Sequence, residues 1–315
     1  ICGKESIVET AKEKYKIIEE MISRDNNLLN ISKLCKVADV SRSGFYSWRK
    51  NKDKREAKEE KDRNDFELIL EAYRYRGFDK GARSIHMRLL HTGVRMNIKK
   101  IRRLMKKFNL KCSIRKANPY RRMAKSMQTS NIAANLVDRN FIQEPRLIIL
   151  TDITYLFYGK ERKKAYMSVM KDCFTNEILS YVVSKSLEVD FVLKTVNLLM
   201  ENHGSSLKTN KTVINSDQGC HYTSIAFREL LKDKKLRQSM SRRGNCWDNA
   251  PQESFFGHMK DEINLKDCGT FEKLVEIIDD YIDYYNNERY QWDLAKLSPN
   301  EYYQYWLTDK SPINV

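Results

Sequence analysis

The stretch Leu147-Ile-Ile-Leu-Thr-Asp152-Ile-Thr-Tyr155 carries a carboxylate at the end of a strongly apolar run, a pattern typical of a buried strand. A second stretch, Thr212-Val-Ile-Asn-Ser-Asp217-Gln-Gly, has the same form. A carboxylate at the last residue of a strand is held rigid by the sheet, yet its head group reaches the open end, where ligands bind. We therefore expect Asp152 and Asp217 to end two strands of one sheet and to share a site.

Glu253 is a third candidate, near the start of a helix predicted in Asn249-Ala-Pro-Gln-Glu253-Ser-Phe-Phe-Gly-His-Met-Lys260. Carboxylate oxygens select Mg²⁺ or Mn²⁺, and two such ions about 4 Å apart can hold the attacking and leaving oxygens of a phosphoryl transfer. Any one of these acids could lie on a solvated turn, but the flanking sequences argue against that reading for all three. We predict that Asp152, Asp217 and Glu253 are catalytic and bind the metal.

The longest motif, Ser241-Arg-Arg-Gly-Asn-Cys-Trp-Asp-Asn-Ala-Pro-Gln-Glu253-Ser-Phe-Phe-Gly-His-Met-Lys260, resembles the signature of Asp-Asp-Glu transposases. Thr151–Tyr155 and Ser216–Tyr222 match the other two blocks, with 64 residues between the aspartates and 35 between Asp217 and Glu253. The resemblance is to insertion-sequence family three, whose members also resemble retroviral integrases, and it covers residues 28–306. Lys260, seven residues after Glu253, completes the pattern.

This resemblance implies a transposase that binds the ends of an insertion sequence and catalyses Mg²⁺-dependent DNA cleavage and strand transfer. Two ions of Mg²⁺, or Mn²⁺, are expected per site, with no nucleotide cofactor. The expected partners are the element's terminal inverted repeats, target DNA and further copies of the chain, in a dimer or larger assembly. Lys260 is expected to contact DNA beside the scissile bond; a surface lysine without a role is the alternative.

Basic residues are concentrated in the first part of the chain, whose net charge is +16. Residues 1–140 contain 35 Lys or Arg and 17 Asp or Glu, whereas residues 141–315 contain 23 and 25. Residues 74–125 hold 18 basic residues and one acid, Asp79. A block of one sign implies a polyanionic partner. DNA is favoured over a membrane surface because glycines interrupt the block and no apolar stretch reaches about eighteen residues.

Two helix-turn-helix segments are predicted, at residues 28–50 and 65–111. In the first, Ser41 is expected to cap a helix that enters a major groove; a small helical hairpin that only packs is the alternative. In the second, Asn97 caps a helix whose apolar face packs while its basic face meets phosphate. The candidate DNA contacts are Arg42, Tyr46 and Arg49 in the first segment and Arg83, Lys99, Arg103 and Lys107 in the second.

The rest of the chain is assigned by pattern. Residues 1–27 are expected to hold an amphipathic helix that could pair with a copy of itself, residues 51–64 a charged helical linker, and residues 112–145 a basic linker. Residues 146–315 form the catalytic core. An antiparallel meander at 146–184, then alternating helices and strands, predicts an α/β ribonuclease-H-like fold: a mixed five-stranded sheet with flanking helices, preceded by the all-α domains.

Cellular context follows from negative observations. The seven cysteines show no Cys-x-x-Cys pair, so neither a disulfide framework nor a zinc module is indicated. We expect a cytoplasmic, nucleoid-associated protein of bacteria, and the first residue, Ile1, suits a fragment or the downstream part of a longer product.

Two other functions compete with transposition. A metal-dependent nuclease on the same fold would cut without rejoining, but it would not need a large DNA-reading region. A regulator that only binds DNA would not require three acids in register.

Overall fold

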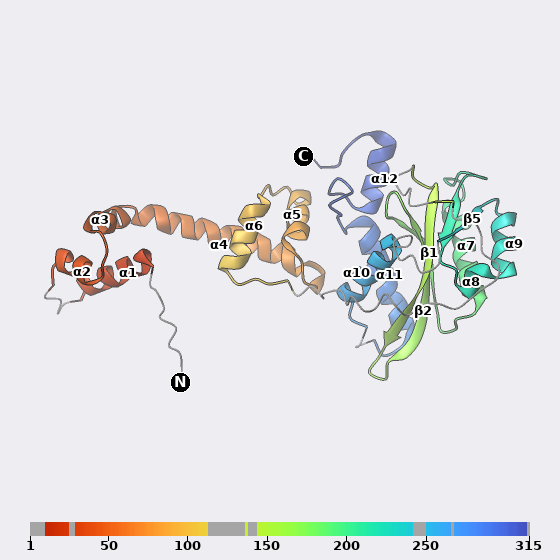
Figure 1. Ribbon diagram of the computed structural model, residues 1–315, viewed down its shortest axis with the longest axis horizontal. Helices are drawn as coiled ribbons and strands as arrows, with labels where there is room; N and C mark the ends of the chain where they lie inside the picture. The colour runs from red at the N-terminus through yellow and green to blue at the C-terminus, as the bar shows by residue number, and fades with distance from the viewer. Residues whose placement is uncertain are drawn as a thin grey trace. The chain divides into compact units, whose positions relative to one another are not determined.

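The computed structural model describes residues 10–24, 29–112, 136–137, 144–241, 250–265 and 268–313 (Figure 1). The chain divides into two compact units, residues 1–68 and 69–315. The basic linker expected at 112–145 lies almost wholly outside the described residues, as do residues 1–9 of the expected N-terminal helix.

The first unit is helical. It contains α1 (Ala11–Ile22), α2 (Ile31–Val37), α3 (Arg42–Lys50) and the beginning of α4 (Lys52–Arg74). The predicted cap at Ser41 is confirmed, because its side chain accepts a hydrogen bond from the Gly44 amide at 2.9 Å. Phe45 is fully buried beside Leu34 in the core of this unit.

Helix α4 is longer than expected. We predicted a linker up to residue 64 and a new helix from Asp65, but α4 runs without interruption from Lys52 to Arg74. The physical reason is composition: the linker is rich in Lys, Glu and Arg, which favour helices, and contains no Gly or Pro to end one.

The second unit begins with a helical part. After a short 3₁₀ turn, η1 (Tyr75–Gly77), come α5 (Ala82–His91) and α6 (Ile98–Lys107). Asn97 caps α6 as predicted, since its side chain accepts from the Lys99 amide at 2.8 Å. Ile101 and Leu104 are fully buried, so the apolar face of α6 packs inward and its basic side chains lie on the exposed face.

A five-stranded mixed sheet forms the centre of the rest of this unit. Its strands are β1 (Ile148–Tyr158), β2 (Lys163–Asp172), β3 (Ile178–Ser184), β4 (Val213–Ser216) and β5 (Arg237–Met240), in the order β3-β2-β1-β4-β5. The β1–β2 and β2–β3 pairs are antiparallel, whereas β4 runs parallel to both β1 and β5. The predicted sheet is therefore confirmed.

Helices cover both faces of the sheet (Figure 1). On one face lie α7 (Val189–His203), the short α8 (Cys220–Thr223) and α9 (Ile225–Asp233), packed around buried Ile149 and Ile214. On the other, α10 (Ala250–Glu262) and α11 (Phe271–Asn287) pack against Leu156, Met167 and Val169. The last helix is α12 (Pro299–Thr308). No helix in the described residues is long and apolar enough to cross a membrane.

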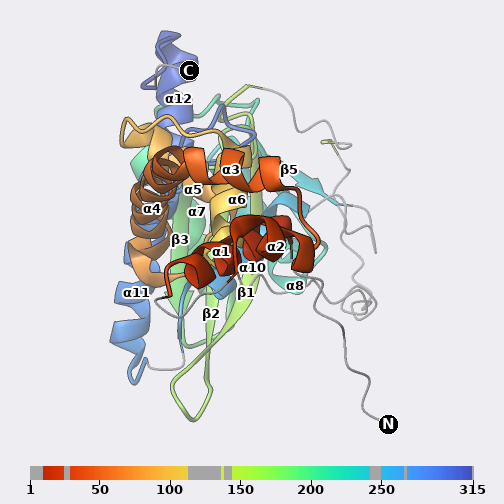
Figure 2. The same ribbon diagram turned by 90° about the vertical axis from the view of Figure 1, so that its left-hand side faces the viewer.

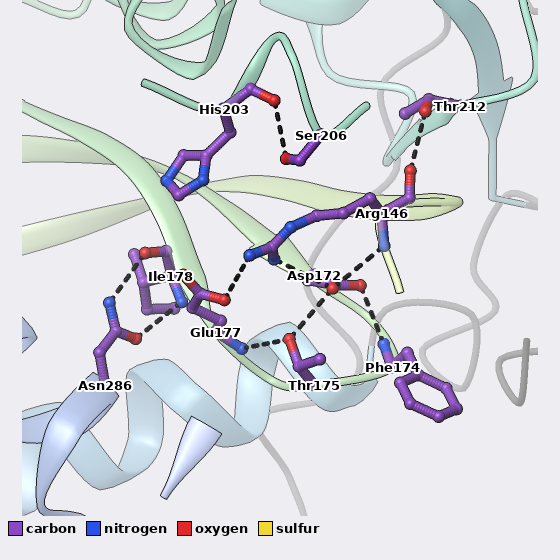
Figure 3. Close-up of polar contacts among 10 residues, drawn as sticks. All are labelled: Arg146, Asp172, Phe174, Thr175, Glu177, Ile178, His203, Ser206, Thr212 and Asn286. Carbon is purple, nitrogen blue, oxygen red and sulfur yellow. Dashed lines mark hydrogen bonds and ion pairs between the residues drawn. The ribbon is translucent and has the colours of Figure 1, made fainter. Parts of the chain in front are cut away.

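A buried ion cluster closes the end of the sheet at which β1 begins (Figure 3). Arg146 donates to Asp172 at 3.1 Å and to Glu177 at 2.6 Å, and all three side chains are buried. Burial raises the pKa of Asp172 and of Glu177, while the Arg146 charge acts in the opposite direction. Because these residues flank β1, β2 and β3, the cluster fastens three strands together where their connections meet.

Candidate active site

Asp152 lies within a strand rather than at its end. We expected it to be a terminal residue, but β1 continues to Tyr158 because it pairs with β2 as a long hairpin. The parallel neighbour β4 behaves as predicted: it pairs with β1 only through Ile148–Leu150 and ends at Ser216. Asp152 is therefore beyond the β4 pairing, and its side chain is partly exposed.

Asp217 is the first residue after β4, and the register brings it level with Asp152. Leu150 pairs with Asn215, so two further residues along each parallel strand lead to Asp152 and Asp217. The Asp217 carboxylate is held by its own turn, because Oδ1 accepts a hydrogen bond from the Gly219 amide at 2.8 Å. Asp152 and Asp217 therefore occupy equivalent positions, two residues beyond the last β1–β4 pair.

Tyr222 is close enough to Asp152 and Asp217 for both negative charges to affect it. Its ring is buried in the core, and its hydroxyl is 3.4 Å from Thr151 Oγ1. Burial raises the pKa of Tyr222 well above its ordinary value, and the negative charges of Asp152 and Asp217 raise it further. The charges of both aspartates therefore act on the same phenol group. Because its pKa is raised, Tyr222 stays neutral and can still form hydrogen bonds.

Glu253 is carried by α10, in its first turn, with its side chain exposed. The opposite side of α10 is anchored, since Phe255 and Met259 are buried against the sheet. The Lys171 ammonium, from β2, also donates to the backbone oxygen of Pro251 at 2.8 Å. Lys171 is buried, and this burial lowers its pKa to about 8.

Lys260, two turns after Glu253 on α10, points toward the strand that carries Asp152. Its ammonium is 2.5 Å from the Thr154 hydroxyl, and Thr154 is two residues beyond Asp152 on the same face of β1. Thus α10 is connected to the sheet at both ends, by Lys171 to its first turn and by Lys260 from its last. Sequence reasoning identified Lys260 but missed Lys171 and Thr154. A lone lysine in the apolar run of β2 was the available signal.

The side chains of Asp152, Asp217 and Glu253 do not form a complete set of metal ligands in this structure. Within the described residues, no three His, Cys, Asp or Glu side chains are grouped closely enough to hold a metal ion. Asp152 and Asp217 occupy equivalent positions beyond the β1–β4 pairing, and Glu253 lies on a helix that packs against β1. Residues 242–249, the part of the long motif that leads into α10, are outside the described residues.

The candidate DNA contacts differ in their surroundings. Arg42 and Tyr46 are exposed on α3, whereas Arg49 forms an ion pair with Glu19 of α1 at 3.3 Å. In the second unit, Lys99, Arg103 and Lys107 are exposed on α6.

Helix α5 instead faces the C-terminal segment. The Arg83 guanidinium is 5.3 Å from the centre of the Trp292 ring, and Arg88 is paired with Glu288 at 3.5 Å. The basic side chains of α5 are therefore engaged within the protein, which leaves α6 as the better candidate for a phosphate-binding face.

The sequence of this chain matches several known protein families and relatives. A profile described as an integrase core domain matches residues 143–246, a second of the same description matches residues 253–307, and an HTH-like domain matches residues 59–118. An uncharacterised transposase-like protein of Haemophilus influenzae is 36% identical over 217 residues, which cover 68% of this chain and 95% of that protein.

A protein of Escherichia coli named "Putative transposase InsK for insertion sequence element IS150" is 31% identical, across 86% of this chain and 93% of its own length. Among solved structures, the catalytic core domain of the HTLV-2 integrase in complex with magnesium is 18% identical, with a TM-score of 0.39. That match covers 50% of this chain and 97% of the other.

Proposed function

Because the chain belongs to the insertion-sequence transposases of family three, enzymes with an integrase core domain that act as polynucleotidyl transferases on DNA, we propose that Asp152, Asp217 and Glu253 form its catalytic site. The observation that carries the proposal is the register of β1 and β4, whose last pair, Leu150 and Asn215, lies two residues before Asp152 and Asp217. Glu253 would complete the site from α10.

The donor set fits Mg²⁺ or Mn²⁺. All three candidates offer carboxylate oxygens, which these hard ions prefer. The nearest imidazole in sequence, that of His221, is occupied elsewhere, because its Nε2 is hydrogen bonded to the Leu187 backbone oxygen at 2.7 Å. When bound, two such ions would supply positive charge that stabilises the attacking and leaving oxygens of a phosphodiester.

The chain's own residues would position the DNA. Lys260 can exchange its Thr154 contact for a phosphate oxygen next to the scissile bond, since its ammonium already lies near the strand of Asp152. A fixed charge at that point would hold the phosphodiester in line for attack. The Gly219 amide keeps the Asp217 carboxylate in one orientation while this occurs.

End recognition is assigned to the helical segments. The exposed Arg42 and Tyr46 of α3 would read base edges of the terminal repeats, and the basic face of α6 would bind phosphates. Because strand transfer requires two element ends in one assembly, the active form would be a dimer or larger. We propose that it works on bacterial DNA in the cytoplasm.

The test is incubation of the protein with labelled element-end DNA and Mg²⁺. A transposase gives both cleaved and joined products, whereas a nuclease gives only cleaved ones and a regulator gives neither. Asp152→Asn, Asp217→Asn and Glu253→Gln should each abolish both products while end binding stays within about threefold, because the basic helices hold the DNA. Equal loss of binding in all three variants would contradict the assigned role.

A further inference from the structure

The β1–β2 hairpin extends past its neighbouring strands. Strand β4 pairs with β1 only up to Leu150, and β3 pairs with β2 only from Tyr166 onward. Among the described strands, the outer part of the hairpin therefore has no further partner. Its ladder continues to the Tyr158–Lys163 pair. Figure 2 shows this segment as a finger that projects from the sheet.

The two faces of this finger differ. Leu156 and Tyr158 point to one face and are buried with the α10–α11 side of the core. The alternate residues Tyr155 and Phe157 point to the other face and are 45% and 41% exposed. Two consecutive outward positions of one strand are therefore aromatic and open to solvent, whereas most other described aromatic side chains of this domain are buried or partly buried.

Cross-strand neighbours extend this surface. Tyr155 is paired with Tyr166, with their rings edge to face at 5.3 Å, and Phe157 is paired with Lys164. The Arg162 guanidinium lies 5.2 Å from the centre of the Phe157 ring. Three aromatic rings and two cations are thus neighbours on one sheet face, which we call the hairpin face (Tyr155, Phe157, Arg162, Lys164 and Tyr166).

The tip of the hairpin is basic. Lys160, Arg162, Lys163 and Lys164 are exposed within five residues, and the single acid among them, Glu161, is paired with Lys163 at 3.3 Å. The remainder of residues 141–315 holds 19 Lys or Arg and 24 Asp or Glu, so the tip is a basic segment in a region without net positive charge. An exposed cationic tip beside solvent-exposed aromatic rings is expected to bind a flexible polyanion that also carries aromatic rings for stacking.

We propose that the hairpin face binds single-stranded DNA, with unpaired bases stacked on Tyr155 and Phe157 and phosphates held by Arg162 and Lys164. Base–aromatic stacking requires bases that are free of a duplex, and it is tolerant of sequence. Side chains two residues apart on a strand are about 7 Å apart, roughly twice the 3.4 Å rise between stacked bases. One base can therefore fit between the two rings.

A second copy of the chain is the less suitable occupant. In a two-fold interface the same patch meets itself, so the four cations of the tip would face one another. The proposal goes beyond the catalytic assignment and does not depend on the metal site, because it concerns binding alone. It can be tested in Ca²⁺ or chelator, where failure of the triad assignment would not affect the result.

The test compares two DNAs that differ only in a single-stranded tail. One is a blunt element-end duplex, and the other is the same duplex with a tail of roughly ten nucleotides, within the length that such sites cover. Wild-type protein should bind the tailed DNA more tightly. Tyr155→Ala and Phe157→Ala should each weaken tailed binding about tenfold, the order expected for loss of one stack, and leave blunt binding unchanged.

Further variants separate stacking from other causes. Phe157→Leu keeps an apolar side chain and should fail like Phe157→Ala, whereas Phe157→Trp should retain binding and show fluorescence quenching by the tail alone. Arg162→Ala combined with Lys164→Ala should flatten the salt dependence of the tail's contribution. Trp306→Ala is the matched control, since Trp306 on α12 is 46% exposed and lies outside the hairpin.

Two results would overturn the inference. Equal weakening on blunt and tailed DNA would show that the hairpin contributes only general affinity. Unchanged binding to both DNAs, with a change in sedimentation of the free protein, would show that the face joins copies of the chain. The thermal unfolding of each variant identifies any that fail to fold, and Phe157→Trp provides a readout that does not depend on loss of binding.

Discussion

At the scale of single residues, Gly219 is needed because of its position beside Asp217. Its backbone is extended, at φ −64° and ψ 154°, a conformation that any residue can adopt. A Cβ atom there would lie 2.8 Å from Asp217 Oδ1, the same atom that accepts the Gly219 amide hydrogen. A larger side chain at position 219 would therefore displace the Asp217 carboxylate without straining the backbone.

We expect Gly219→Ala to slow single-turnover cleavage by roughly 10–100-fold, the scale for a displacement of about 1 Å at a reacting centre. The midpoint of thermal unfolding should change little. Gly257→Ala is the control, because a Cβ atom at Gly257 on α10 would have no neighbour within 4 Å. A wild-type cleavage rate for Gly219→Ala would show that the Asp217 orientation is not critical.

Some residues of the candidate site could be predicted from the sequence, and others could not. The three acids and Lys260 could be identified because each stands in a motif with fixed spacing. Tyr222 and Thr154 could not be assigned their neighbours, because their contacts join β1 to α8 and to α10, across long separations in the chain. Such contacts depend on strand register, which no local pattern specifies.

At the scale of elements, α10 carries one proposed ligand while the sheet carries two. Its first turn is tied to β2 by Lys171, which sits opposite Leu150, two residues from Asp152. A buried ammonium is costly in free energy and is often replaceable by an apolar side chain without loss of stability. This suggests that Lys171 serves to position α10 rather than to stabilise the fold.

Lys171→Met should accordingly leave the free energy of unfolding within about 1 kcal/mol of wild type, or raise it. Cleavage should nonetheless require severalfold more Mg²⁺ for half-maximal rate, because Glu253 is less well placed. Lys194→Met, at an exposed position of α7, is the matched control. If Lys171→Met lost stability and kept the wild-type Mg²⁺ dependence, Lys171 would have only a structural role.

Element boundaries were predictable where a local signal exists. Ser41 and Asn97 were correctly identified as caps, since capping depends on a few adjacent residues. The position of Asp152 inside β1 was not predictable, because the end of a strand depends on its partner. Here β2 extends β1 on one side, while β4 stops on the other.

At the scale of the whole molecule, the charge is divided between parts with different tasks. The basic excess lies in residues 1–140, and the proposed catalytic carboxylates lie in a part of nearly balanced charge. We therefore expect different substitutions to change the affinity for DNA, the sequence specificity and the catalytic rate.

Arg42→Ala and Tyr46→Ala should reduce discrimination between the true element end and random DNA by about 1–3 kcal/mol each. Arg103→Ala or Lys107→Ala should instead weaken both DNAs alike and lower the salt slope by about one unit. Arg228→Ala, which removes a charge from exposed α9, is the control. Titration of both DNAs at several salt concentrations distinguishes these outcomes, and equal effects of all the variants would contradict the division.

The division of the three acids between sheet and helix also has a thermodynamic consequence. An ion that needs ligands from both would add a further link between α10 and the sheet, which share one core, so its binding and the folding of the domain are linked. At a concentration one hundred times its Kd, such an ion adds about 2.7 kcal/mol to the free energy of unfolding. Wild-type protein should melt several degrees higher in Mg²⁺ than in chelator, and Asp217→Asn combined with Glu253→Gln should remove the difference. An equal shift of the melting temperature in wild type and in the double variant would show that the ion binds elsewhere. If the double variant shows no shift, calorimetry of the protein without DNA measures the metal affinity of this site.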